Sequence, residues 1–162
     1  MQTLLSREES INKLLNNIPK DGLVVGCNGR ISRELFELRK KRKEPTNDFY
    51  MLGSMGCAIP LALGLALNTK KKVYCLVGDG NFLMKLGALV TAFKCRPNNL
   101  YIIVINNDRH DSTGGQPTAF SAIRHFLPVK IIDVLPGSRK DLGRPTMSGK
   151  QITKNFRKKI CS

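Results

Sequence analysis

Two short polar clusters carry the residue types that bind a metal ion and phosphate. Gly78-Asp79-Gly80-Asn81 directly follows an apolar run at 73–77, and Asn106-Asn107-Asp108 follows another at 100–105. An aspartate carboxylate, an asparagine amide oxygen and a loop carbonyl such as that of Arg109 are ligands suited to Mg²⁺, whose remaining positions phosphate oxygens and water can fill. Glycines let the backbone approach a ligand closely. The clusters therefore predict a site for Mg²⁺ and a phosphorylated cofactor.

The elements that must hold these clusters are predicted to be parallel strands. The strand-like runs are apolar throughout, which is typical of a parallel sheet covered by helices on both faces. We therefore predict an α/β fold with a doubly wound parallel sheet of about five or six strands. Ligands bind beyond the carboxyl ends of such strands, so the two clusters should be neighbours. A helix beginning near Asn81 would direct its N–H groups toward a diphosphate.

The pattern of apolar residues and turn signals places each element. Strands are predicted at 23–27, 73–77, 100–105 and 129–134, with turns or loops at 28–30 and 106–118. A capping box at Ser6 and Glu9 begins the first helix. Further helices are predicted at 31–38, 58–67, 83–93, 119–126 and 152–160. The helix at 58–67 is small and apolar on all sides, so we expect it to be deeply buried.

The net charge of +15 is concentrated in a run at 39–43 and in the residues from Arg139 onward. We interpret it first as a solvated lysine-rich surface. A nucleic-acid patch would be accompanied by interleaved aromatic residues or a recognised motif, and neither is present. Attraction of an anionic substrate and cofactor is a further interpretation. We therefore predict no nucleic-acid partner.

The sequence contains no signal for a membrane or for export. No apolar stretch reaches the roughly 18 residues that cross a bilayer, and the first nine residues have no signal-peptide core. The five cysteines form no CxxC pair, which fits a reducing compartment and argues against a zinc site. The predicted location is the cytoplasm.

At this point the sequence resembles a known family. A GDG cluster followed by Asn-Asn at this separation is similar to the thiamine-diphosphate-binding motif. Longer segments resemble phosphonopyruvate and sulfopyruvate decarboxylases, namely NDFYMLGSMG at 47–56, GDGNFLMKLGALVT from Gly78, HDSTGGQPT at 110–118 and GSRKDLGRP at 137–145. The last segment favours the phosphonopyruvate branch. The resemblance extends from Ser6 to about Pro145.

The resemblance implies a role for each matching residue. Asp79, Asn107 and the backbone carbonyl of Arg109 would bind Mg²⁺. Met55 would lie under the cofactor, the Gly53 carbonyl would accept a hydrogen bond from its aminopyrimidine, and His110 is a tentative catalytic residue for proton transfer or substrate contact. The implied thiamine-diphosphate-binding residues are Gly29, Ser32, Gly53, Ser54, Met55, Gly78, Asp79, Gly80, Asn81 and Asn107.

The same resemblance implies a diphosphate-binding domain at 1–145 and a basic C-terminal tail at 146–162. Enzymes of this family need a second domain that holds the aminopyrimidine and supplies an activating glutamate. All five glutamates here fit capping or exposed helix positions, namely Glu8, Glu9, Glu34, Glu37 and Glu44. We therefore expect a pyrimidine-binding alpha subunit as partner.

The function that the resemblance implies is decarboxylation of 3-phosphonopyruvate to phosphonoacetaldehyde and CO₂. One alternative is the beta subunit of a sulfopyruvate decarboxylase, and another is a non-catalytic cofactor-binding or regulatory subunit. An anionic 2-oxo acid needs cations near its acidic group. The candidates are Arg109, His110, Arg139, Lys140 and Arg144.

Overall fold

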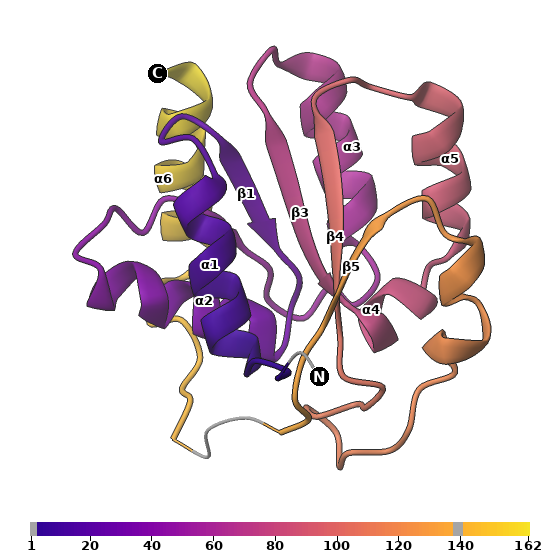
Figure 1. Cartoon of the computed structure of the whole chain (residues 1–162). Helices are drawn as coiled ribbons and strands as arrows, with labels where there is room; N and C mark the ends of the chain where they lie inside the picture. Colours follow the sequence, from indigo (N-terminus) through magenta and orange to yellow (C-terminus); the bar gives the residue numbers. More distant parts are fainter. Residues whose placement is uncertain (1–2, 138–140) are drawn as a thin grey trace.

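The computed structural model describes residues 3–137 and 141–162 and shows one sheet flanked by helices (Figure 1). Its strands are β1 (Leu23–Gly26), β2 (Phe49–Tyr50), β3 (Val73–Gly78), β4 (Leu100–Asn106) and β5 (Lys130–Asp133). Its helices are α1 (Arg7–Asn17), α2 (Arg30–Lys41), α3 (Ala58–Asn68), α4 (Asp79–Leu83), α5 (Gly87–Cys95) and α6 (Gly149–Cys161), with 3-10 helices η1 (Phe120–Ala122) and η2 (Arg124–Phe126).

The strands pair in the order β2-β1-β3-β4-β5, and every pair is parallel. The chain first moves outward from β1 to β2 and then returns past β1 to β3. Right-handed crossovers therefore place α2 on one face and α3 and α5 on the other. Figure 1 shows α1 beside α2, and α3 beside α5. The predicted doubly wound α/β fold is confirmed, and its switch point lies between β1 and β3.

The prediction of one continuous helix at 83–93 is wrong. The chain forms the short α4, turns, and begins α5 at Gly87. Two hydrogen bonds between residues three positions apart stabilise the turn, from Ala88 N to Lys85 O and from Leu89 N to Leu86 O, both 3.0 Å. Val90, an apolar residue within the predicted helix, is 68% exposed. The helix expected at 119–126 is likewise replaced by η1 and η2.

Helix α3 is covered on one face only, so the prediction of deep burial is wrong for the other face. The residues on its buried side are Ala58, Ile59, Ala62, Leu63 and Ala66. Gly64 is exposed, and Leu67 is 56% exposed. Amino-acid composition alone does not distinguish a helix that is buried on all sides from a helix that has one apolar face exposed.

Helix α6 packs against β2, a short strand that the sequence pattern did not reveal. Ile152 and Phe156 are buried, and the ring of Phe156 lies 5.4 Å from that of Phe49 in an edge contact. Lys159 Nζ lies 3.3 Å from the buried carboxylate of Asp48. Much of the basic segment at 146–162 is therefore an ordered helix. Among the described residues, no helix is long and apolar enough to span a membrane.

Candidate cofactor site

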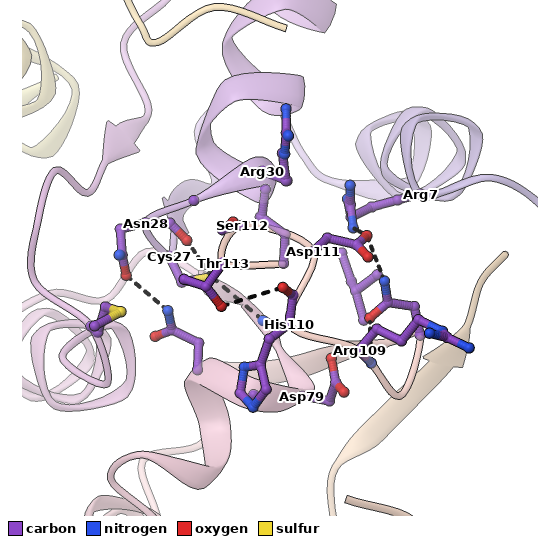
Figure 2. A pocket seen from close by; sticks show the side chains of 18 of the residues that line it. Arg7, Cys27, Asn28, Arg30, Asp79, Arg109, His110, Asp111, Ser112 and Thr113 are labelled. Atoms are coloured by element: carbon purple, nitrogen blue, oxygen red, sulfur yellow. Dashed lines mark hydrogen bonds and ion pairs between the residues drawn. The ribbon is translucent and has the colours of Figure 1, made fainter. Parts of the chain in front are cut away.

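The loops that follow β1, β3 and β4 enclose a cavity at the carboxyl edge of the sheet (Figure 2). This is the place that a doubly wound topology favours for ligands. Nine of the residues singled out from the sequence line it together: Gly29, Met55, Gly78, Asp79, Gly80, Asn81, Asn107, Arg109 and His110. The two polar clusters are thus brought into one site.

Three predicted residues do not line this cavity. Ser32 is buried, and its hydroxyl donates to the carbonyl of Gly26 at 2.9 Å, which leaves it supporting the turn before α2. Gly53 and Ser54 are exposed in the loop before α3. Gly53 has a φ of +72°, a left-handed conformation that suits glycine. This loop reaches the cavity through Met55.

Asn81 joins two of the loops around the cavity. Its Nδ2 donates to Asn28 Oδ1 at 2.8 Å, and its Oδ1 accepts a hydrogen bond from the backbone N–H of Gly56 at 2.8 Å. Gly29 has a φ of +91°, and a Cβ there would lie 2.9 Å from Ser112 Oγ. The turn at 28–30 therefore depends on glycine both for its conformation and for its close approach to the loop after β4.

Asp79 carries a buried carboxylate that is 2% exposed. Burial raises the pKa of Asp79, against hydrogen bonds from Thr118 and from backbone N–H groups that lower it. The Thr118 hydroxyl donates to Asp79 Oδ2 at 2.6 Å. Within the described part of the chain, no lysine or arginine forms an ion pair with Asp79. A buried carboxylate in this condition fits a divalent cation, which would supply the missing positive charge.

The loop after β4 folds back on itself and carries the remaining candidate ligands. His110 N donates to Gln116 O at 2.8 Å, and Thr118 N donates to Asp108 O at 2.9 Å. Asn107 Nδ2 donates to Asp111 Oδ2 at 2.7 Å, while Asn107 Oδ1 accepts from the backbone N–H of Arg109 at 3.2 Å. The described residues contain no cluster of three or more His, Cys, Asp or Glu side chains fit for a metal. Amide, carbonyl and phosphate oxygens would therefore complete the coordination.

A buried arginine beside the cavity escaped the sequence analysis. Arg7, in the first turn of α1, donates to both carboxylate oxygens of Glu34 at 2.9 and 3.0 Å and to Asp111 Oδ2 at 2.9 Å. The prediction that Glu34 is exposed or a capping residue is wrong, since it is 4% exposed. Burial raises the pKa of Glu34, and Arg7 opposes that rise. The predicted capping box at Ser6 and Glu9 is confirmed, and the helix that it caps begins at Arg7.

Only some of the cationic residues that we predicted near the substrate line the cavity. Arg109 and His110 line the cavity, together with Arg30 and Arg7. Arg144 is exposed and does not line it. Arg139 and Lys140 lie outside the described residues.

An α/β domain with an acidic residue, amides and glycine turns at the switch point of a parallel sheet belongs to the class of cofactor-binding domains that hold phosphate and a metal ion. The family follows from comparison with known proteins. Residues 24–138 match the family model described as "Thiamine pyrophosphate enzyme, C-terminal TPP binding domain", and the chain belongs to this family. The resemblance inferred from the motifs is confirmed.

Relatives with curated names are similar over much of this chain. It is 42% identical to a phosphonopyruvate decarboxylase of Streptomyces viridochromogenes, over 94% of this chain and 45% of the relative. It is 44% identical to a sulfopyruvate decarboxylase subunit beta of Methanothermobacter thermautotrophicus, over 71% of this chain and 60% of the relative. The corresponding subunit of Methanocaldococcus jannaschii is 39% identical, over 69% and 57%. The chain thus spans about half the length of these relatives.

Proposed function

We propose that this chain is the diphosphate- and Mg²⁺-binding part of a thiamine-diphosphate-dependent decarboxylase that converts 3-phosphonopyruvate to phosphonoacetaldehyde and CO₂. The observation that carries the proposal is the buried carboxylate of Asp79, which has no cationic partner among the described residues and shares a cavity with Asn107 and Arg109. Two phosphonopyruvate decarboxylases, 42% and 41% identical to this chain, support the choice of reaction.

Different residues around the cavity would bind the metal ion and the diphosphate. Asp79, the Asn107 amide oxygen and the Arg109 carbonyl would hold Mg²⁺. Backbone N–H groups of the turn at 28–32 and of Gly80 and Asn81 would contact the diphosphate. When bound, thiamine diphosphate supplies the electron sink for the electron pair left by CO₂. The protein's own contribution is then to bind, orient and shield the reacting groups.

Three further roles are proposed, for two residues that line the cavity, His110 and Met55, and for Gly53 in the loop that carries Met55. His110 lines the cavity and would exchange a proton with the substrate or contact its acidic group. Met55 would lie under the cofactor, and the Gly53 carbonyl would accept a hydrogen bond from the aminopyrimidine. Met55 is 55% exposed in the isolated chain, which fits a side chain that is covered only when cofactor and partner are present.

The substrate is proposed to be an anionic 3-substituted pyruvate because arginines gather at the cavity. Arg30 and Arg109 both line it. Guanidinium groups bind phosphonate and sulfonate oxygens by charge-assisted hydrogen bonds. Sulfopyruvate is the second candidate, and similarity to the beta subunits of sulfopyruvate decarboxylases from archaea supports it.

A pyrimidine-binding alpha subunit is proposed to supply the activating glutamate. The names of the beta-subunit relatives support only the existence of a partner subunit. Glu34 is not available for that task because Arg7 holds both of its oxygens. Met55 and Met84 line the cavity and are 55% and 50% exposed. An apolar rim of this kind fits a docking surface beside the cofactor. The free cysteines support a reducing compartment, which we propose is the cytoplasm.

The test is turnover by the chain assembled with its pyrimidine-binding partner, in Mg²⁺ and thiamine diphosphate. We expect CO₂ and phosphonoacetaldehyde from phosphonopyruvate, with a kcat/KM well above that for pyruvate. A higher kcat/KM for sulfopyruvate would transfer the assignment to that substrate. Tight cofactor binding without turnover of any 2-oxo acid would instead identify a non-catalytic subunit.

A further inference from the structure

A chain of three side chains connects α1 to the candidate metal ligand Asn107. Arg7 Nη1 donates to Asp111 Oδ2 at 2.9 Å, and the same oxygen accepts from Asn107 Nδ2 at 2.7 Å. Figure 2 shows Arg7 and Asp111 pointing toward one another beside the cavity. The side chains of Arg7 and Asp111 are only 7% and 10% exposed. Water therefore has little access to this connection.

The contact with Asp111 decides which way the Asn107 amide points. An ionised carboxylate can only accept hydrogen bonds, so the edge of the amide that faces Asp111 must be its NH₂ group. The carbonyl oxygen Oδ1 is then directed to the opposite edge of the amide, where the Arg109 N–H already bonds to it at 3.2 Å. A carbonyl oxygen keeps a second lone pair for a metal ion.

Arg7 is in turn fixed by a second carboxylate. Glu34, from α2, receives two hydrogen bonds from Arg7 at 2.9 and 3.0 Å, a bidentate geometry that restricts the guanidinium plane. The third donor, Nη1, is thereby aimed at Asp111. Since an unpaired charge in a buried site is unfavourable, Arg7 and Asp111 hold one another in these positions.

We propose that Arg7 and Asp111 are positioning residues for Mg²⁺, which orient the Asn107 amide so that its oxygen is presented to the ion. The inference rests on the metal site of the proposed function. It makes α1 part of the cofactor site, although Arg7 is far from the GDG and Asn-Asn clusters in sequence. Residues that orient a metal ligand commonly change metal affinity by roughly 10- to 100-fold when they are replaced.

The experiment measures binding of Mn²⁺, a spectroscopic substitute for Mg²⁺, to the assembled protein with thiamine diphosphate at a fixed concentration. Asp111→Asn keeps the size of the side chain but can present NH₂ to Asn107, so the amide loses its defined orientation. We expect Mn²⁺ binding to weaken by roughly 10- to 100-fold. Arg7→Gln should weaken it in the same direction. The double variant should be no weaker than Asp111→Asn, because both residues act through one contact.

Control variants separate this role from a structural one. Arg33→Gln removes a neighbouring arginine of α2 that donates to Leu142 O and lies outside the chain of contacts, so it should leave Mn²⁺ binding unchanged. Melting temperatures identify variants whose fold is impaired. If Arg7→Gln unfolds, Asp111→Asn alone decides the question. A folded Asp111→Asn protein with wild-type Mn²⁺ affinity would overturn the positioning role.

The site itself is tested separately with Asp79→Ala. Loss of Mn²⁺ binding in Asp79→Ala together with unchanged binding in Asp111→Asn would leave the proposed metal site in place and reject only the role of Arg7 and Asp111. Unchanged binding in Asp79→Ala would reject the metal site, and the proposed function with it.

Discussion

The imidazole ring of His110 lies directly against Gly80, so that a Cβ added to Gly80 would meet His110 Cε1 and Nδ1 at 2.5 Å. Real Cβ contacts are essentially never this short. Glycine at this position therefore makes room for the histidine ring. Gly80 of the GDG cluster and His110, the candidate proton-transfer residue, pack directly against each other.

Replacing Gly80 by Ala is expected to displace the His110 ring and to destabilise the protein by about 1–3 kcal/mol, the usual effect of overpacking. The matched test is the same substitution in a His110→Ala background, where the new methyl group has space. We expect most of the lost stability to return in the double variant. Urea unfolding of the four proteins measures this, and equal losses in both backgrounds would show that the two residues do not compete for space.

Replacing Asp79 by Asn should separate stability from binding. In the metal-free protein at pH 7, the substitution removes a buried charge without a cationic partner among the described residues. We therefore expect a gain of about 1 kcal/mol, or a rise in Tm of about 2–4 °C. Mg²⁺ with thiamine diphosphate should no longer raise the Tm further, because binding to the folded state is lost. Asp21→Asn, an exposed aspartate, is the control. If the cofactor raised the Tm of Asp79→Asn as much as that of the wild type, Asp79 would not be part of the site.

The exposed apolar residues near the cavity are expected to contact the pyrimidine-binding partner. Met84 lines the cavity and is 50% exposed, so Met84→Asp should weaken assembly by at least tenfold, as central contacts of an interface commonly do. Phe126→Asp serves as control, since Phe126 is 84% exposed and does not line the cavity. Sedimentation or light scattering of mixtures measures the effect. Weaker assembly in the control alone would place the interface elsewhere.

The chain without its partner is expected to release no CO₂ from phosphonopyruvate, even with Mg²⁺ and thiamine diphosphate present. In the proposed function the partner supplies the activating carboxylate, and loss of a general acid or base lowers rates by roughly 10²–10⁴-fold. Activity should appear when the pyrimidine-binding partner is added. Substantial turnover by the purified chain alone would mean that a carboxylate of this chain activates the cofactor.

The ion pair between Arg124 and Asp133 predicts a dependence of stability on pH. Its two hydrogen bonds, at 2.9 and 2.7 Å, connect η2 to β5, and the bond from Arg124 lowers the pKa of Asp133 below the ordinary 3.8. A lowered pKa in the folded state stabilises the fold above the ordinary value, and this contribution is lost as the pH falls through the lowered value. Because the pair is partly exposed, it should contribute only about 0.5 kcal/mol.

Arg124→Gln should therefore be less stable than the wild type at pH 6, and this difference should shrink as the pH falls below 3.8. Urea unfolding at a series of pH values measures the change. A difference that stays constant with pH would show that Arg124 acts by packing alone.

Sequence alone determined the fold class and most of the cavity. Local apolar runs and turn residues predicted strands near β1, β3, β4 and β5, and strand polarity then required their carboxyl-end loops to meet. Asp79, Asn107 and His110 were therefore correctly expected at one place, and they line one cavity. Their roles toward the cofactor remain predictions. These features can be predicted from sequence because the spacing of apolar residues and the positions of turn-forming residues are local properties of the chain.

Only the tertiary structure decided which charges pair and which apolar faces stay open. The contacts of Arg7 with Glu34 and Asp111 connect α1, α2 and the loop after β4, and a charged residue in a helical pattern reads as exposed until its partners are known. The exposure of Leu67 and Val90 was equally hidden, since an apolar side chain looks the same in a core or at an interface. Burial and charge pairing depend on residues that meet only after folding, and the sequence pattern around each residue does not record those partners.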